Sequence, residues 1–115
     1  MRDERLYLAD MLEAVRDLKN FVAGAPPDAF EENRMIRWAA VQRLMTLGEA
    51  AARVSDALKS RHPEVPWAEL TAFRNVLVHG YFSLRWEIVR EAAVNQAPGL
   101  EPHIERILKT EFFEG

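Results

Sequence analysis

The segment WAELTAFRNVLVHGY, residues 67–81, predicts a short helix with polar side chains crowded at its end. The helix is expected to run from about Trp67 to His79 and to stop at Gly80, because glycine most easily takes the left-handed conformation at a helix end. The polar exceptions in its apolar second half are Arg74, Asn75, His79 and Tyr81. An ordinary bundle helix turns its polar residues to solvent, so this cluster is the leading candidate for a chemical site.

Apolar residues at helical spacing continue the pattern towards the N-terminus. Over residues 4–23 they lie three and four apart, and Gly24-Ala25-Pro26-Pro27 ends that helix because two prolines cannot continue it. A second helix is expected from an N-cap at Asp28 to about Ser60, with a bend or a new start near Asn33.

Gly48 lies in the middle of this second predicted helix, where glycine costs about 1 kcal/mol relative to alanine. Close approach of another helix is the usual reason for such a glycine, and the three alanines that follow Glu49 support it. Glu49 itself is expected to be exposed. If it is buried, it needs a cation such as Arg74 or Arg53.

Residues 84–95 and 100–112 predict two further helices, or one helix that is kinked near Pro98-Gly99. No alternating strand pattern, hairpin signal or internal repeat stands out in the sequence. Helices joined by short loops favour an antiparallel bundle. The expected fold is therefore all-α, an up-and-down bundle of four to five helices in a single domain over residues 1–115.

Composition and charge limit the classes of function. The 115 residues carry a net charge of -3 without a strongly basic segment, which disfavours tight sequence-blind nucleic-acid binding but leaves a weak, locally basic cleft open. The absence of cysteine excludes disulfides, thiolate catalysis and Cys-ligated zinc. His62 and His103 look like surface residues without partners at metal-ligand spacing, so no metal site is expected. No apolar run approaches the about 20 residues that span a bilayer, and the N-terminus is unlike a signal peptide, so we expect a cytoplasmic protein without membrane contact.

The spacing of Arg74 and His79 raises a geometric question. Five residues at 3.6 per turn place them about 140° apart around a helix axis, whereas Asn75 and His79 share a face. Three arrangements could bring Arg74 and His79 to one ligand. The helix could distort near Gly80, the long Arg74 side chain could reach around, or a second subunit could place its own copy alongside across a two-fold axis.

An arginine and a histidine together suit phosphodiester chemistry. The guanidinium can hold two phosphate oxygens, and imidazole can move a proton near neutral pH. In RNA the neighbouring 2′-hydroxyl supplies the nucleophile, so neither a metal nor an enzyme nucleophile is required. His79 would take the 2′ proton or protonate the leaving 5′ oxygen, Arg74 would stabilise the charge on phosphorus, and Asn75 could orient His79 or a phosphate. From spacing alone, a purely structural role for the same side chains is the more common outcome.

Three quoted segments resemble one known family. The run Arg74-Asn75-Val76-Leu77-Val78-His79-Gly80-Tyr81 resembles the Arg-x4-His-x-Tyr motif of HepT-like toxins, a branch of the HEPN superfamily. Leu47-Gly48-Glu49-Ala50-Ala51 is similar to that family's second-helix signature. Val65-Pro66-Trp67 followed by Phe73-Arg74-Asn75 is similar to its third-helix entry. The resemblance covers about residues 5–110.

This resemblance implies a HEPN helical bundle that acts as a homodimer, with the motifs of two copies facing each other across a cleft. It implies a metal-independent endoribonuclease without a cofactor, in which Arg74 and His79 are catalytic and Asn75 accompanies them. RNA rather than DNA would be the substrate. The implied partner is a minimal nucleotidyltransferase antitoxin that transfers AMP from ATP to Tyr81, giving O-AMP-tyrosine. The adenylate would place bulk and negative charge where an RNA phosphate must sit.

Two other classes of function stay open at this point. The chain could be a non-catalytic interaction module that serves as substrate or scaffold for a nucleotidyltransferase, and the lack of a basic patch favours this. It could also be a plain dimerisation domain whose polar motif residues satisfy a helix end.

Overall fold

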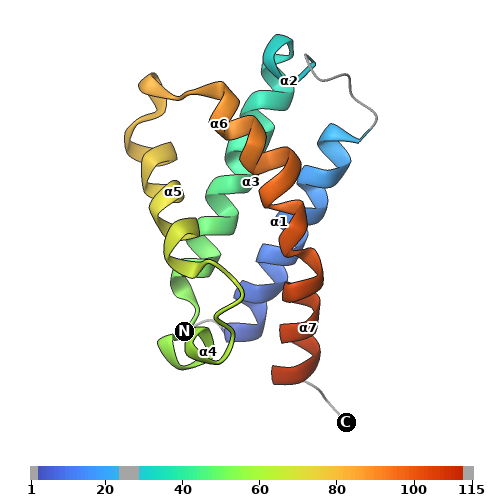
Figure 1. The fold of residues 1–115 in the computed structure, drawn as a ribbon, viewed down its shortest axis with the longest axis vertical. Coiled ribbons are helices and arrows are strands. Elements are labelled where there is room, and N and C mark those ends of the chain that lie inside the picture. Colours follow the sequence, from blue (N-terminus) through green and yellow to red (C-terminus); the bar gives the residue numbers. More distant parts are fainter. Residues whose placement is uncertain (1–2, 24–28, 113–115) are drawn as a thin grey trace.

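The computed structural model describes residues 3–23 and 29–112 (Figure 1). Its helices are α1 (Glu4–Val22), α2 (Ala29–Glu32), α3 (Arg34–Arg53), α4 (Asp56–Arg61), α5 (Trp67–His79), α6 (Trp86–Glu91) and α7 (Glu101–Glu111). Short 3-10 turns, η1 (Tyr81–Ser83) and η3 (Pro98–Leu100), and a π-helical turn, η2 (Ala92–Gln96), connect them. The all-α prediction is confirmed for the part of the chain that the structure describes.

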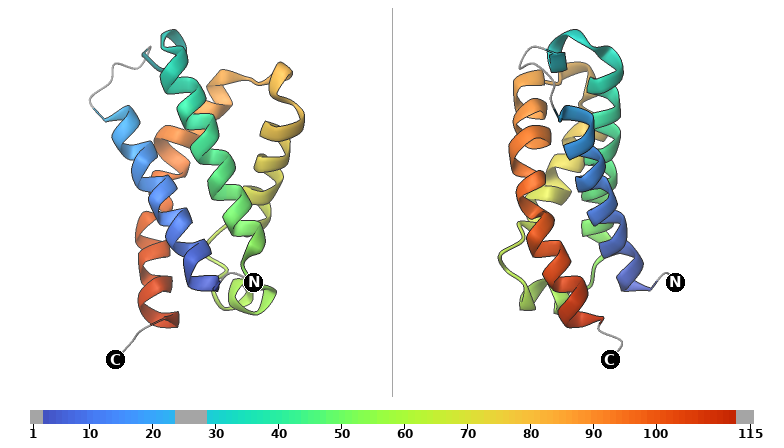
Figure 2. Two further views of the ribbon diagram at one scale, coloured as in Figure 1. Left: turned by 180° about the vertical axis from the view of Figure 1, so that it is seen from behind. Right: turned by 90° about the vertical axis from the view of Figure 1, so that its right-hand side faces the viewer.

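The longer helices form two layers. α3 packs against α1 on one side and α5 on the other, and α7 packs on α1. The right-hand view of Figure 2 shows α1 and α3 on one side of the molecule and the α6–α7 path on the other, with α5 between them. Figure 1 shows that α1, α3, α5 and the α6–α7 path alternate in direction, which is the predicted up-and-down arrangement.

The core forms because each helix turns one apolar face inward. On α1 the buried positions Leu8, Met11, Val15 and Leu18 fall on the predicted spacing of three and four. They meet apolar side chains of the neighbouring helices, including Leu47 of α3, Leu77 of α5, and Ile104 and Ile107 of α7. Burying one such aliphatic side chain contributes about 1.5–3 kcal/mol, so this shared core holds the two layers together.

The second predicted helix corresponds to α2, α3 and α4 in the structure. Its expected new start is confirmed, because the Asn33 side chain caps α3 by accepting a hydrogen bond of 3.1 Å from the backbone N–H of Ile36. The expected N-cap at Asp28 lies outside the described residues. The predicted end at Ser60 is wrong, because α3 stops at Arg53. Ser55 starts a new helix by accepting from the backbone N–H of Leu58, and its own N–H donates to Glu4 of α1.

The C-terminal half agrees with the second of the two alternatives, because α6 and α7 are joined by helical turns rather than by a loop. α6 passes into η2, where the backbone N–H of Ala97 donates to the carbonyl of Ala92 at 2.8 Å. This bond spans five residues, one more than an α-helical bond. Pro98 has no N–H to donate, and the chain tightens into η3 before α7 begins. The path from Trp86 to Glu111 is therefore helical with a local distortion, as Figure 1 shows.

The end of α5 lies where it was predicted, but for a different reason. Gly80 has φ -120° and ψ 23°, so it does not take the left-handed conformation. Its N–H still donates to the carbonyl of Val76 at 2.8 Å. A Cβ at Gly80 would lie 3.1 Å from that carbonyl oxygen, so the small residue relieves crowding at the helix end.

Among the described residues, no helix is both long enough and apolar enough to cross a lipid bilayer.

Candidate active site

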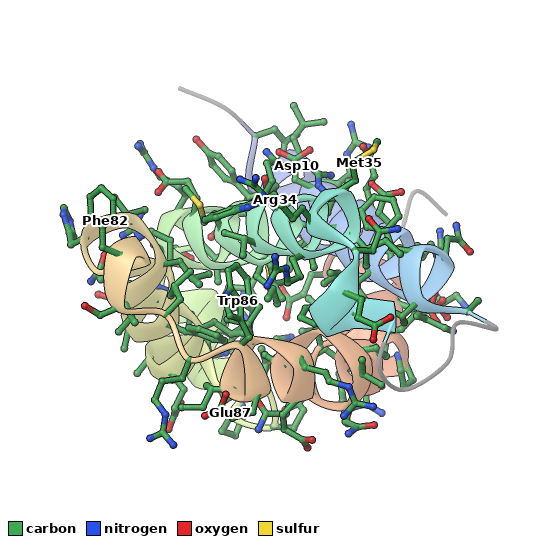
Figure 3. All side chains as sticks on the ribbon, turned by 90° about the horizontal axis from the view of Figure 1, so that it is seen from above. Asp10, Arg34, Met35, Phe82, Trp86 and Glu87 are labelled. Atoms are coloured by element: carbon green, nitrogen blue, oxygen red, sulfur yellow. The ribbon has the colours of Figure 1, made fainter. Side chains whose placement is uncertain are left out.

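An open pocket of about 800 Å³ lies where α1, α3 and α5 meet. Its lining comprises Tyr7 and Asp10 of α1, Gln42, Met45, Thr46, Glu49, Ala50 and Arg53 of α3, and Arg74, Asn75, Val78 and His79 of α5. Figure 3, seen from above, shows Asp10 on the side of the bundle opposite Glu87 of α6. The pocket therefore lies on the side of α1 and α3, where α5 meets them, away from α6.

Arg74 and His79 both line this pocket within a single chain. α5 remains α-helical through His79, so no distortion near Gly80 is needed to bring them to one cavity. Arg74 instead reaches across to α3, where it forms an ion pair with Glu49. Of the three arrangements considered from the spacing, the reach of the long side chain is the one found within the chain.

Asn75 contacts Arg74 rather than His79. Its Oδ1 accepts a hydrogen bond of 2.9 Å from Nε of Arg74. The guanidinium is thus held by an amide on one side and by the Glu49 carboxylate on the other. The Arg74 side chain is only 22% exposed, so it is positioned by packing as well as by charge.

Glu49 connects two arginines. Its Oε1 accepts from Nε and Nη2 of Arg53 at 3.2 and 3.1 Å, while its Oε2 faces Nη1 of Arg74. The expectation that Glu49 is exposed is correct in part, because its side chain is 46% exposed. Both arginines named as its possible partners are in fact its partners.

Gly48 explains how α5 comes close enough for this contact. A Cβ built at Gly48 would lie 2.5 Å from Cβ of Arg74 and 2.6 Å from the backbone oxygen of Leu70. The predicted close approach of another helix is therefore confirmed, and the helix is the one that carries the candidate site. Only a residue without a side chain leaves room for the backbone of α5 at this distance.

The remaining members of the polar cluster lie at the open end of α5. His79 is exposed at the pocket, in the last turn of the helix. Tyr81 begins η1 with its backbone two residues further on, and its side chain lies outside the described part of the structure.

Several lining residues were not predicted from the sequence. They are Tyr7, Asp10, Gln42 and Thr46. A signal for the α3 residues exists, because Gln42, Thr46, Glu49 and Arg53 recur at intervals of three and four and therefore share one helix face. Their Gln42–Thr46 pair is joined by a side-chain hydrogen bond of 3.2 Å.

His62 is not the surface residue that the sequence suggested. Its side chain is 13% exposed and lies between two carboxylates, with Nε2 at 2.7 Å from Glu111 and Nδ1 at 3.4 Å from Glu64. His62 is partly covered because the loop after α4 lies against α7, the helix that carries Glu111. His103 bonds to Arg106 on its own helix at 2.9 Å. No group of three or more His, Asp or Glu side chains within residues 3–23 and 29–112 is arranged to hold a metal ion.

The arrangement places a cation, an amide and an imidazole around one open cavity. Arg74 can hold an anion, and exposed His79 can exchange a proton with a bound group. The opposing carboxylates of Asp10 and Glu49 keep the pocket from being a strongly positive surface.

Comparison with known proteins gives a consistent result. Residues 11–107 match the family described as Ribonuclease HepT-like. A protein of Methanocaldococcus jannaschii named "Putative RNase MJ1380" is 36% identical over 94 residues, which are 78% of this chain and 86% of that protein. "Putative RNase TTE0752" of Caldanaerobacter subterraneus is 30% identical over 96% of this chain and 99% of its own. "Probable ribonuclease HepT" of Thermococcus cleftensis is 27% identical over 94% and 98%. No solved structure gives a significant match.

Proposed function

This chain belongs to the HepT-like ribonuclease family, and on that premise we propose that it is a metal-independent endoribonuclease with Arg74 and His79 as its catalytic pair. The observation that carries the proposal is that these two side chains, about 140° apart on one helix, line the same pocket. An exposed imidazole and a fixed guanidinium in one pocket provide a proton-transfer group and a charge-stabilising group for RNA cleavage by its own 2′-hydroxyl.

In the proposed reaction the 2′ oxygen attacks the neighbouring phosphorus and the bond from phosphorus to the 5′ oxygen breaks. His79 either accepts the 2′ proton, with water protonating the leaving 5′ oxygen, or protonates the 5′ oxygen while water takes the 2′ proton. Arg74 stabilises the negative charge that builds on the unesterified oxygens, and Asn75 keeps Arg74 oriented through the bond to its Nε. The products end in a 2′,3′-cyclic phosphate on one side and a 5′-hydroxyl on the other.

The biological role proposed is that of a toxin in a toxin–antitoxin system, acting as a homodimer in the cytoplasm. A minimal nucleotidyltransferase would be the antitoxin. The hydroxyl of Tyr81 would attack the α-phosphorus of ATP, lose its proton and release pyrophosphate. The resulting adenylate lies two residues from His79 along the chain, where its charge and bulk oppose an RNA phosphate. The support for this role is the Arg74–Tyr81 motif itself.

The test is incubation of the purified protein, with its intact mass showing an unmodified Tyr81, with total cellular RNA in EDTA. The matched variants are His79→Ala at the pocket and His103→Ala on α7, outside the pocket. We expect wild type and His103→Ala to leave 2′,3′-cyclic phosphate ends and His79→Ala to leave RNA intact. Equal cleavage by His79→Ala and wild type would show that the activity does not come from this site.

One observation favours a second function, that of a non-catalytic substrate or scaffold for a nucleotidyltransferase. Glu49 neutralises Arg74 in the pocket, and a neutralised arginine is a poor phosphate ligand. This alternative expects a stable complex with the nucleotidyltransferase and AMP on Tyr81, but no RNA cleavage by the unmodified protein. The EDTA incubation therefore separates the two functions.

A further inference from the structure

Arg53 shares a carboxylate with the proposed catalytic arginine, although it lies on a different helix. Arg53 directs Nε and Nη2 at one oxygen of Glu49, and Arg74 directs Nη1 at the other oxygen. The two guanidinium groups therefore converge on one carboxylate group, that of Glu49. All three side chains line the pocket that also contains His79.

A phosphodiester can take the place of that carboxylate. Like a carboxylate, it carries one negative charge shared by two unesterified oxygens, and arginine forks bind both groups in the same manner. The Nε–Nη2 fork of Arg53 would hold one oxygen and Nη1 of Arg74 the other. The bond from Nε of Arg74 to Asn75 does not have to break during this exchange.

Displacing Glu49 breaks its ion pairs with both arginines, and contacts of the same arginines to the phosphate replace them. Arg53 and Glu49 are four residues apart on α3, and their side chains are 61% and 46% exposed. Exposed ion pairs at this spacing contribute little to the stability of a helix. The half-exposed Glu49 carboxylate can turn to solvent when an anion takes its place between the two arginines. The pair thus does little for the stability of α3, and a ligand-binding role accounts better for its place in the pocket.

We propose that Arg53 and Arg74 together form a binding site for one phosphodiester group of RNA, and that Glu49 occupies this site in the free protein. The proposal rests on the proposed function in that the ligand is RNA. It adds Arg53 as a phosphate-binding residue and Glu49 as the internal competitor that the phosphate displaces. While Glu49 pairs with both arginines, their charge is partly neutralised. A chain with a net charge of -3 therefore presents a local cationic site only once a ligand has displaced Glu49.

Binding is measured in the His79→Ala background, so that the RNA is not consumed. The probe is a short fluorescein-labelled single-stranded RNA, and its dissociation constant is followed by fluorescence anisotropy over a series of salt concentrations. The added substitutions are Arg53→Ala, Arg53→Lys, Glu49→Gln and, as control, Arg85→Ala. Arg85 is an exposed arginine that also pairs with a glutamate, Glu87, but lies outside the pocket.

Arg53→Ala should weaken binding by about tenfold and make it less sensitive to salt, because one charge-assisted contact to a phosphate is lost. Arg53→Lys should recover part of the affinity. Glu49→Gln should tighten binding by about fivefold, since the internal competitor is removed while its shape is kept. Arg85→Ala should match the background in both affinity and salt dependence.

The proposal is overturned if Arg53→Ala binds like Arg85→Ala, if Glu49→Gln weakens binding, or if the background binds no RNA. These outcomes are independent of cleavage. If wild type cleaves RNA but the substitutions at positions 49 and 53 do not change RNA binding, the proposed ribonuclease function stands and the two-arginine site is refuted. If wild type does not cleave RNA but the variants show the expected changes in binding, the two-arginine site stands and the proposed ribonuclease function is refuted.

Discussion

Replacing Gly48 with alanine adds a single methyl group at the point where α3 and α5 are closest. The new Cβ would lie 2.5 Å from Cβ of Arg74 and 2.6 Å from the backbone oxygen of Leu70. Carbon atoms in favourable contact are about 3.5–4.0 Å apart. Neither neighbour is the flexible end of a side chain, so α5 itself must move away by about 1 Å to accept the methyl group.

The expected change in stability is the difference of two opposing effects. Overpacking of a closely packed contact costs about 1–3 kcal/mol, and both contacts here are with rigid atoms. Alanine in place of glycine in a helix returns about 1 kcal/mol. The variant should therefore be less stable by up to about 2 kcal/mol, which lowers Tm by up to about 8 °C for a domain of this size.

Catalysis should suffer more than stability, because the displaced segment carries Arg74. A misplacement of about 1 Å can reduce a rate by about a hundredfold. Denaturant unfolding and RNA cleavage are measured for Gly48→Ala and for Gly99→Ala, a control whose added Cβ meets nothing within 4 Å. If Gly48→Ala equals the control in both measurements, the close approach at Gly48 does not set the position of α5.

Substitutions at three further positions test the fold. Arg61 and His62 hold the pKa of Glu111 down from 4.5 to about 2, so wild type should be more stable than Glu111→Gln above about pH 4.5 and lose this advantage as the pH falls towards 2. Urea unfolding across this range measures it, and a difference that does not vary with pH would contradict the pairing. Asn33→Ala should lose about 1 kcal/mol of unfolding free energy with the cap of α3, and Asn33→Asp should keep it. Ile104→Ala, at a position with 0% exposure, should cost about 2–5 kcal/mol by denaturant unfolding, and Ile104→Val only about 0.5–1.5 kcal/mol.

The helices that sequence predicted best are those whose ends are set by local chemistry. The expected range 4–23 matches α1 at Glu4–Val22, because regular apolar spacing is followed by two prolines. The expected range 67–79 matches α5. Asn33 was recognised as a start because its side chain bonds within its own helix. In each case the information lies within a few residues of the boundary.

The features that sequence did not predict depend on distant segments. Just after α3 ends at Arg53, the N–H of Ser55 bonds to Glu4, which is 51 positions away in the chain, while the Ser55 side chain caps α4 locally. His62 is partly buried because Glu111 meets it from α7. Neither partner can be identified from spacing along one helix, since each contact exists only after the layers have packed.

The candidate site combines both kinds of information. A local motif identifies Arg74 and His79, but the position and pairing of Arg74 in the pocket depend on two adjacent residues of α3. Gly48 sets how closely α5 approaches, and Glu49 supplies the charge that Arg74 meets there. Gly48→Ala changes the distance without changing charge, and Glu49→Gln changes charge while leaving the helix backbone alone. If both reduce RNA cleavage, position and pairing of Arg74 both matter. If only Gly48→Ala does, Glu49 acts as a competitor for the arginine rather than as its support, as the two-arginine site requires.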